Sequence, residues 1–329
     1  TRNYSRTATT TSVTTDTFSG WRYYHWPLDI SGLKAGGYSW NSSVTLPIGD
    51  NGTSRTITWD GCIQERKTYQ NTDGDPSNDY NPVPANAWDL DIDMVPSTGD
   101  PESQWRPLLP GAFWGRWDTS GNRTQNEVNT STWGASNINY EMPRGYDTYS
   151  CPRPARKLAV YKTAAEVTDF KTYVDALSAS SQTYHDIGMA WGARLISPTG
   201  LFATENALTS NGGTIERHLI FMTDGAAVSN NEALTSHGHA WWDRRESTST
   251  SDTVLEKSIN ARLSALCTAV KNRNITLWVI YYGTVGSSDA TRLTTCASPG
   301  RFYNATSSQQ LIDQFKAIAS EISQLRLTN

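Results

Sequence analysis

The hydrophobic and polar positions follow two different patterns along the chain, and the change lies near residue 150. Before it, helical periodicity is absent, and short alternating pieces such as SRTITWDGC stand between Gly, Pro and Asn turns. After it, apolar residues recur at helical spacing in segments that alternate with short apolar runs. The pattern predicts a β-rich, irregular, aromatic region at residues 1–150 and an α/β region at residues 151–329.

The second region opens with a helix signal. Thr163-Ala-Ala-Glu166 has the sequence of a capping box, in which two side chains satisfy free backbone N–H groups at the helix start. The helix that follows would carry an apolar face. This face consists of Val167, Phe170, Val174 and Leu177. Further helices are predicted over residues 186–196, 252–272, 288–296 and 309–326.

Apolar runs bounded by turn signals predict strands at 217–223 and 275–283, both buried on two faces, and a brief strand at 301–305. Strands that alternate with helices predict a doubly wound, mostly parallel α/β sheet. Ligands of such sheets bind outside the carboxyl ends of the strands, and the first run ends at Asp224-Gly225. We therefore expect Asp224 to face a ligand crevice, with the alternative that it only caps a turn.

Composition excludes several classes of partner. The 329 residues carry a net charge of −4 with 18% charged residues, so no basic field favours nucleic acid or an anionic membrane. No apolar segment approaches the roughly 20 residues that span a bilayer. A signal peptide is absent, and the chain begins at Thr1 rather than Met, which we interpret as a processed or trimmed product.

The four cysteines form no C-x-x-C pair, which disfavours a zinc or redox motif. Buried thiols in a reduced protein remain an alternative, but scarce lysine and abundant Ser, Thr and Asn favour disulfides. The predicted pairs are Cys267–Cys296 and Cys62–Cys151, one in each region. Disulfides would imply an oxidising compartment.

A second residue accompanies Asp224 as a candidate ligand. Thr183 lies in a polar loop directly before the helix predicted at 186–196. A threonine hydroxyl and an aspartate are hard oxygen ligands, which suit Mg²⁺, Mn²⁺ or Ca²⁺ better than zinc.

Together, Thr183 and Asp224 resemble part of the ion site of a von Willebrand factor A domain. That family holds a divalent ion at a metal-ion-dependent adhesion site made from a first-strand D-x-S-x-S loop, a threonine loop and an aspartate loop. Thr183 matches the second loop and Asp224 the third. The resemblance implies an A-type fold and a divalent cation, with Mg²⁺ the first choice and Ca²⁺ or Mn²⁺ the alternatives.

Longer phrases are similar to TadG-type proteins of the tight-adherence (Flp) pilus machinery. They are WDGCIQER (59–66), DLDIDMVP (89–96), YHDIGMAWGARLISP (184–198), LIFMTDG (219–225), the Cys267/Cys296 region and FKAIASEISQLRLT (315–328). Such proteins have one N-terminal membrane anchor and an A domain that a long insertion interrupts. The resemblance implies the bacterial cell envelope, at its periplasmic or extracellular face, with pilus proteins, envelope proteins or a surface receptor as partners.

The chain departs from the family at the first-strand loop. DTSGN (118–122) comes closest to D-x-S-x-S, but Asn122 replaces the last serine. We expect the missing strand and loop upstream of Thr1 or on a separate polypeptide, with residues 1–150 as the insertion. This chain alone would then hold only part of the ion's coordinating groups.

The loop HGHAWWDRR (237–245) offers a further candidate surface. Trp and Arg dominate interface hot spots, so a partner-binding patch is predicted. Its residues are Trp241, Trp242, Arg244 and Arg245. Packing of the tryptophans onto the insertion is the alternative. His237 and His239 are expected to face solvent rather than to bind a metal.

Two acidic segments could in principle bind calcium. NTDGDPSNDYN (71–81) lacks the glycine and glutamate of an EF-hand, so a solvated, turn-rich loop is favoured. DLDIDM (89–94) predicts a strand with Asp89, Asp91 and Asp93 on one face. Arginines such as Arg66 and Arg106, rather than Ca²⁺, are expected opposite these charges.

No nucleophile elbow, Walker loop or H-E-x-x-H motif occurs, and a non-enzymatic protein is predicted. The expected function is adhesion or pilus assembly through a metal-dependent contact with a partner. The alternatives are a carbohydrate-binding module built from the aromatic residues of 1–150, a metal-dependent hydrolase and a metal-independent structural scaffold.

Overall fold

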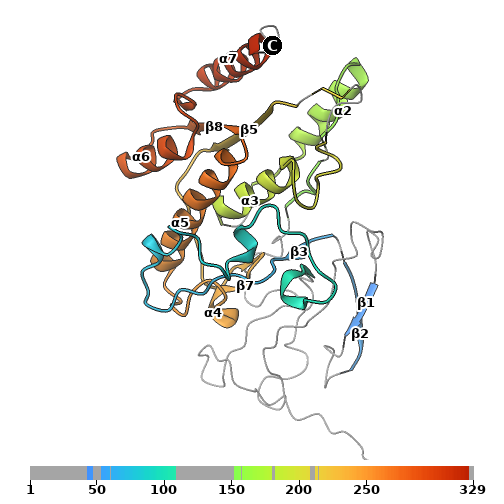
Figure 1. Ribbon diagram of the computed structural model, residues 1–329, viewed down its shortest axis with the longest axis vertical. Coiled ribbons are helices and arrows are strands. Elements are labelled where there is room, and N and C mark those ends of the chain that lie inside the picture. The colour runs from blue at the N-terminus through green and yellow to red at the C-terminus, as the bar shows by residue number, and fades with distance from the viewer. Residues whose placement is uncertain are drawn as a thin grey trace, which may run out of the picture.

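The computed structural model describes residues 43–46, 53–59, 61–108, 152–156, 158–179, 182–207, 212–213 and 215–325. Its centre is a parallel three-stranded sheet in the order β5-β8-β9 (Figure 1). These strands are β5 (Arg217–Thr223), β8 (Ile275–Tyr282) and β9 (Phe302–Ala305). The predicted α/β class with a parallel sheet is therefore confirmed, with each strand within a residue of its expected bounds.

Helices cover both faces of this sheet. The helices of the α/β region are α2 (Ala164–Asp175), α3 (His185–Ile196), α5 (Asp252–Lys271), α6 (Ser287–Cys296) and α7 (Ser308–Leu325). On one face, α3, α5 and α6 enclose a core with the odd-numbered residues of β8. On the other face, α7 packs on Trp278 and Ile280 through Ile318.

The helix starts show why local sequence predicted them so well. Thr163 and Glu166 form the expected capping box: the Thr163 hydroxyl accepts from the Glu166 N–H, and the Glu166 carboxylate accepts from the Thr163 N–H. The apolar face of α2, however, is covered only in part, with the Phe170 ring 5.0 Å from the Tyr161 ring. Phe170 and Val174 are 42% and 43% exposed.

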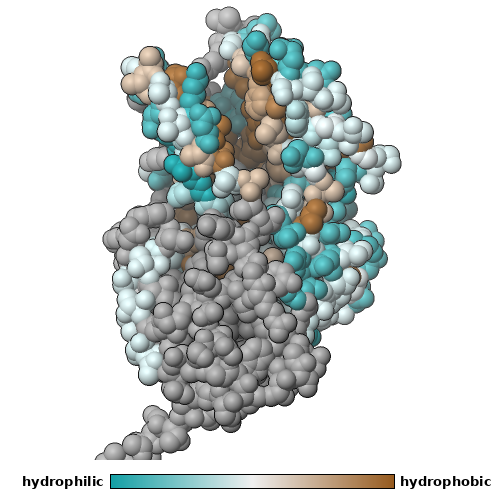
Figure 2. All heavy atoms as spheres, turned by 180° about the vertical axis from the view of Figure 1, so that it is seen from behind, coloured by the Kyte–Doolittle hydropathy of each residue, from teal (hydrophilic) through white to brown (hydrophobic). Residues whose placement is uncertain are grey.

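Strand β5, unlike β8, is buried on one face only. Leu219 and Phe221 pack into the core under α3 and α5, whereas Ile220 and Met222 on the other face are 40% and 51% exposed. The prediction that β5 is buried on both faces is therefore wrong. This face of β5 is exposed because α7 packs on β8 instead, and no described strand pairs with the free edge of β5. In Figure 2, apolar residues line a hollow at the end of the molecule where Figure 1 places α2 and α7.

The described part of residues 1–108 adds short elements. They are β1 (Ser43–Leu46), β2 (Arg55–Thr58), β3 (Ile63–Gln64), β4 (Arg106–Pro107) and the 3-10 turns η3 (Pro76–Asn78), η4 (Trp88–Leu90) and η5 (Pro101–Ser103). Tyr80, Leu90 and Ile92 enter the core beside α3 and α5. The two regions that differ in sequence pattern thus share a core, and the boundary at 150 stays a prediction.

A short unit follows β5: β6 (Leu234–Thr235), β7 (Gly238–His239) and α4 (Ala240–Asp243). The predicted disulfide Cys267–Cys296 is confirmed and joins the end of α5 to the end of α6. Cys151 lies outside the described residues, so the second pair stays a prediction. Within the described part of the chain, no helix is both long and apolar enough to cross a bilayer.

Candidate functional site

The carboxyl end of β5 brings together the two segments that carry the predicted ligands. Thr183, half-buried before α3, exchanges two backbone hydrogen bonds with Val228, at 3.0 and 3.1 Å. Val228 follows β5 by only a short turn, and the exposed Asp224 lies in that turn. The loop before α3 is therefore fastened to the segment that carries Asp224, at the end of the sheet where α/β proteins bind ligands.

His185 holds the turn that presents Asp224. Its Nε2 lies 2.9 Å from the Thr223 hydroxyl, which itself donates to the Gly225 carbonyl at 3.1 Å. Because that hydroxyl proton is engaged, Nε2 must carry the imidazole proton and donate it to Thr223. Burial and the nearby positive charge of Arg292 lower the pKa of His185 to about 4, so the ring is neutral at neutral pH.

A divalent cation would find hard oxygen donors here, but few of them. The Thr183 hydroxyl and the Asp224 carboxylate are of the right chemical type, and they come from two segments that meet at one end of β5. Small hard cations require about six oxygen donors, several of them water. The described residues thus fit part of a cation site, and the assignment of Thr183 and Asp224 as ligands stays a prediction.

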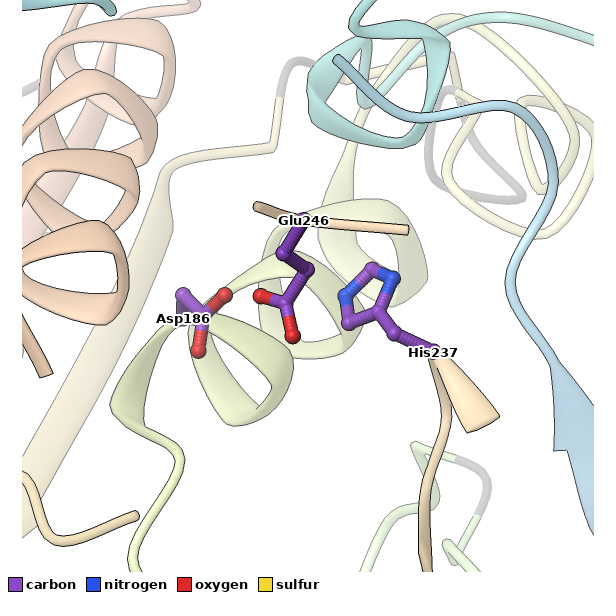
Figure 3. A group of neighbouring side chains, drawn as sticks. All are labelled: Asp186, His237 and Glu246. Atoms are coloured by element: carbon purple, nitrogen blue, oxygen red, sulfur yellow. The ribbon is translucent and has the colours of Figure 1, made fainter. Parts of the chain in front are cut away.

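A second group of side chains was not foreseen. Asp186 on α3, His237 between β6 and β7, and Glu246 after α4 have ligand atoms within 4.8 Å of one another, and all three residues are buried. Figure 3 shows the carboxyl groups of Asp186 and Glu246 directed toward one another, with the His237 ring turned to Glu246. This buried group could hold a metal ion.

Arg262 of α5 already brings positive charge to the same group. Its Nε donates to Asp186 at 2.7 Å and lies 3.8 Å from Glu246, while its Nη2 contacts Asp89 and lies 3.3 Å from His237 Nε2. A metal ion bound by His237 Nε2 would compete with this guanidinium. Arg262 therefore occupies the cationic position of the cluster, and the simplest description is a buried ion-pair network.

The network still contains more carboxylate oxygens than donors to satisfy them. Asp89 Oδ1, Asp186 Oδ1 and Glu246 Oε1 are buried without a hydrogen-bond partner. Burial, together with the charges of Asp186 and Asp89, raises the pKa of Glu246 to about 7, and burial raises the pKa of Asp186. A proton on Glu246 near neutral pH would thus relieve the repulsion without any metal.

Further ion pairs attach residues 61–108 to α3. Arg194 binds both carboxylate oxygens of Glu65, at 2.7 and 3.1 Å, and Trp105 donates to the same carboxylate at 3.1 Å. Removing one partner of such a buried pair leaves an uncompensated charge, which costs several kcal/mol. These contacts fix the segment to the α/β core.

Two of the four residues of the predicted partner-binding patch pack inside the protein, and the other two remain half-buried. Trp242 is 3% exposed and packs with His239, and Arg245 donates to the carbonyls of Glu65 and Arg66. Both side chains are therefore used inside the protein, as in the alternative of packing onto residues 1–150. Trp241 and Arg244 are half-buried, with the guanidinium 5.2 Å above the indole. A partner for this pair stays a prediction.

Two local expectations require correction, and a third is confirmed. His237 and His239 are 3% and 1% exposed, so they do not face solvent. Residues 89–94 do not form a strand: η4 ends at Leu90 and a turn follows at 92–93, because Asp89 is directed inward to Arg262 while Asp91 is exposed. Arginines do compensate these acids, as expected: Arg262 pairs with Asp89, Arg273 pairs with Asp93, and Arg66 donates to the Asp91 carbonyl at 3.4 Å.

The acidic loop at 71–81 is closed by an amide. Asn71 Nδ2 donates to Asp73 and to Asp79, both at 2.7 Å, and Asn71 Oδ1 accepts from the Gly74 N–H. Asp75 is exposed and pairs with Lys257 at 3.2 Å. This internal hydrogen bonding suits the turn-rich loop that the sequence favoured.

One signal in the sequence could have revealed the buried network. Arg262 lies on the apolar stripe of α5, at helical spacing from Ile259 and Leu266, and a charge at such a position requires buried partners. The partners of Arg262 come from distant segments, so the sequence does not reveal which residues they are. Comparison with known proteins adds no assignment: no protein family, curated protein or solved structure matches the chain.

Proposed function

We propose that this protein is a non-enzymatic component of a bacterial cell-surface pilus or adhesion system. Its A-type domain would bind a protein or surface partner through a divalent cation at the carboxyl end of β5. The observation that carries the proposal is the fastening of the Thr183 loop to the turn of Asp224, through Val228 and through His185 and Thr223. The likeness of the sequence to TadG-type proteins supports the pilus setting.

Each residue would have a distinct role. The Thr183 hydroxyl would be a direct ligand, and Asp224 would accept a hydrogen bond from a coordinated water, an arrangement that orients ligands around a metal. The bound cation, with few anionic ligands, would supply an electrophilic position for a carboxylate of the partner. His185 would keep the Thr223–Gly225 turn in the shape that presents Asp224. The remaining donors would come from the predicted first-strand loop.

The proposal is tested in cells that produce the complete protein. Asp224→Ala and Thr183→Ala should each lower Mg²⁺-dependent adhesion or pilus display about tenfold, the effect of removing one charge-assisted contact. EDTA should lower wild-type adhesion equally. Asp313→Ala is the matched control, since Asp313 is an exposed aspartate on α7. Unchanged adhesion of the Asp224 and Thr183 variants would refute the proposal.

A metal-independent scaffold is the second candidate. The exposed apolar residues of α2 and β5 favour it, because contiguous apolar surface marks contact sites between proteins. In that case Phe170→Ser and Met222→Ser would impair assembly, while Asp224→Ala and EDTA would leave it intact. Saccharide binding that EDTA does not change would instead indicate the carbohydrate-binding alternative.

A further inference from the structure

A basic pocket lies among residues that are not part of the proposed cation site. It has a volume of about 430 Å³ and forms where residues 65–70, residues 102–106 and residues 243–245 meet. Its size lies within the range of ligand pockets, roughly 300–1,000 Å³. None of its lining residues belongs to the proposed cation site or to the Asp186, His237 and Glu246 group.

Positive charge predominates on the pocket wall. Five lining residues are basic, and three are acidic, which gives a local formal charge of +2 in a chain of net charge −4. The basic residues are Arg66, Lys67, Arg106, Arg244 and Arg245. Each acid already has a partner: Glu65 binds Arg194, Glu102 binds Lys67 on the same wall, and Asp243 accepts the His239 N–H at 2.8 Å.

Two of the arginines keep unused donors. Arg66 Nε and Arg245 Nη1 are buried nitrogen atoms without a hydrogen-bond partner, and Arg66 is only 2% exposed. A buried donor without an acceptor costs about 1–3 kcal/mol, which an anion at this wall would recover. Burial and the neighbouring charge of Arg194 also lower the pKa of Arg66 to about 10, although the carboxylates of Glu65, Asp89 and Asp91 act in the opposite direction.

Aromatic rings stand beside the basic residues. Lys67 Nζ lies 5.0 Å from the centroid of the Trp88 ring, and the Arg244 guanidinium lies 5.2 Å from that of Trp241. Both tryptophans are half-buried, so each ring is partly open to a partner. Arginine and tryptophan side by side are typical of the energetic centre of protein–protein interfaces.

We propose that this pocket binds an acidic segment of a protein partner, with Arg244 and its neighbours receiving Asp or Glu carboxylates. Guanidinium groups bind carboxylates through paired hydrogen bonds, which gives geometric specificity. A nucleic acid is the poorer fit, because it needs an extended basic surface and this chain is acidic overall. The inference is independent of the cation site and goes beyond the proposed function.

The test uses a fluorescent oligoglutamate peptide and the full chain. Binding should be saturable and should weaken as salt is added, since exposed charges are screened beyond roughly 10 Å at 0.1 M. Arg244→Gln should weaken binding about tenfold. Arg301→Gln is the matched control, because Arg301 is also a partly exposed arginine stacked on a tryptophan, 4.6 Å from the Trp278 centroid. Its affinity should equal that of the wild type.

Several results would overturn the inference. They are the absence of saturable binding, equal losses in Arg244→Gln and Arg301→Gln, and tighter binding of a single-stranded oligonucleotide at the same pocket. A second readout guards against misfolding: the thermal midpoint of Arg244→Gln should match that of Arg301→Gln without peptide, and only the control should be stabilised by peptide. EDTA should leave peptide binding unchanged, which separates this site from the cation site.

Discussion

The two faces of the central sheet are built differently, although β5 contributes to both. On the face under α3 and α5, Leu277 and Val279 of β8 are fully buried, and Phe221 of β5 packs with them. On the opposite face, α7 covers β8 but leaves Ile220 and Met222 of β5 exposed. The face under α3 and α5 is therefore closed, whereas the opposite face is open at β5.

The closed face also positions the candidate sites. α3 packs on α5 and on β5, and its first turn carries His185 toward the end of β5 and Asp186 toward Arg262. Residues of both candidate sites thus lie on a helix that packs into the core. The larger core and the exposed apolar residues of β5 thus lie on opposite sides of one sheet.

The largest effect is expected on the closed face. Leu263→Ala should lower the free energy of unfolding by about 3 kcal/mol, because Leu263 is 0% exposed and its loss leaves a cavity between α5 and the sheet. Denaturant unfolding measures it. Lys257→Ala on the same helix, which removes only an exposed ion pair, should cost under about 1 kcal/mol. Equal costs would show that the closed face is not the stabilising one.

An intermediate effect depends on pH. The pKa of Glu246 is about 7 in the folded protein and about 4.5 when unfolded, so the folded state holds its proton longer. The contribution of protonated Glu246 to the free energy of unfolding is therefore fully present below pH 4.5 and is lost as pH rises to 7. Glu246→Gln removes this loss, so its stability relative to the wild type should improve by about 2 kcal/mol between pH 5 and pH 7.5.

Paired denaturant titrations at the two pH values measure this change. An opposite contribution comes from His239, whose pKa burial lowers to about 4, so its contribution is lost as pH falls from 6.5 toward 4. His239 is present in both proteins and cancels in the difference. A constant gap between Glu246→Gln and the wild type would contradict the raised pKa.

The smallest effect is expected on the open face. Met222→Ser should change the free energy of unfolding by less than about 1 kcal/mol, since Met222 is already 51% exposed. Binding of an apolar fluorescent dye should fall in the same variant, because the exposed apolar surface becomes smaller. A loss as large as that of Leu263→Ala would mean that this face is covered in solution.

Much of the fold followed from sequence because the signals are local. The capping box at Thr163 and the apolar stripe of α5 depend on neighbours three or four residues apart, and strand β8 is one continuous apolar run. The exposure of one face of β5 could not be predicted, because an apolar run has the same sequence pattern whether or not another element covers it.

The candidate sites were less predictable for a related reason. Position at a strand end sufficed to select Asp224, but the network of Asp89, Asp186 and Glu246 depends on side chains from segments far apart in sequence. Asp89 was assigned to a strand because alternation suggested it, and tertiary pairing with Arg262 overrode that local pattern.

Nuclear magnetic resonance with Mn²⁺ as a paramagnetic probe tests the central claim most directly, since it locates even a weakly bound cation. We expect the strongest line broadening at the backbone amides of Thr183, Asp224 and Gly225, with its loss in Asp224→Ala and its persistence in Glu246→Gln. Broadening centred on His237 and Glu246, or no localised broadening at all, would contradict a cation site at the carboxyl end of β5.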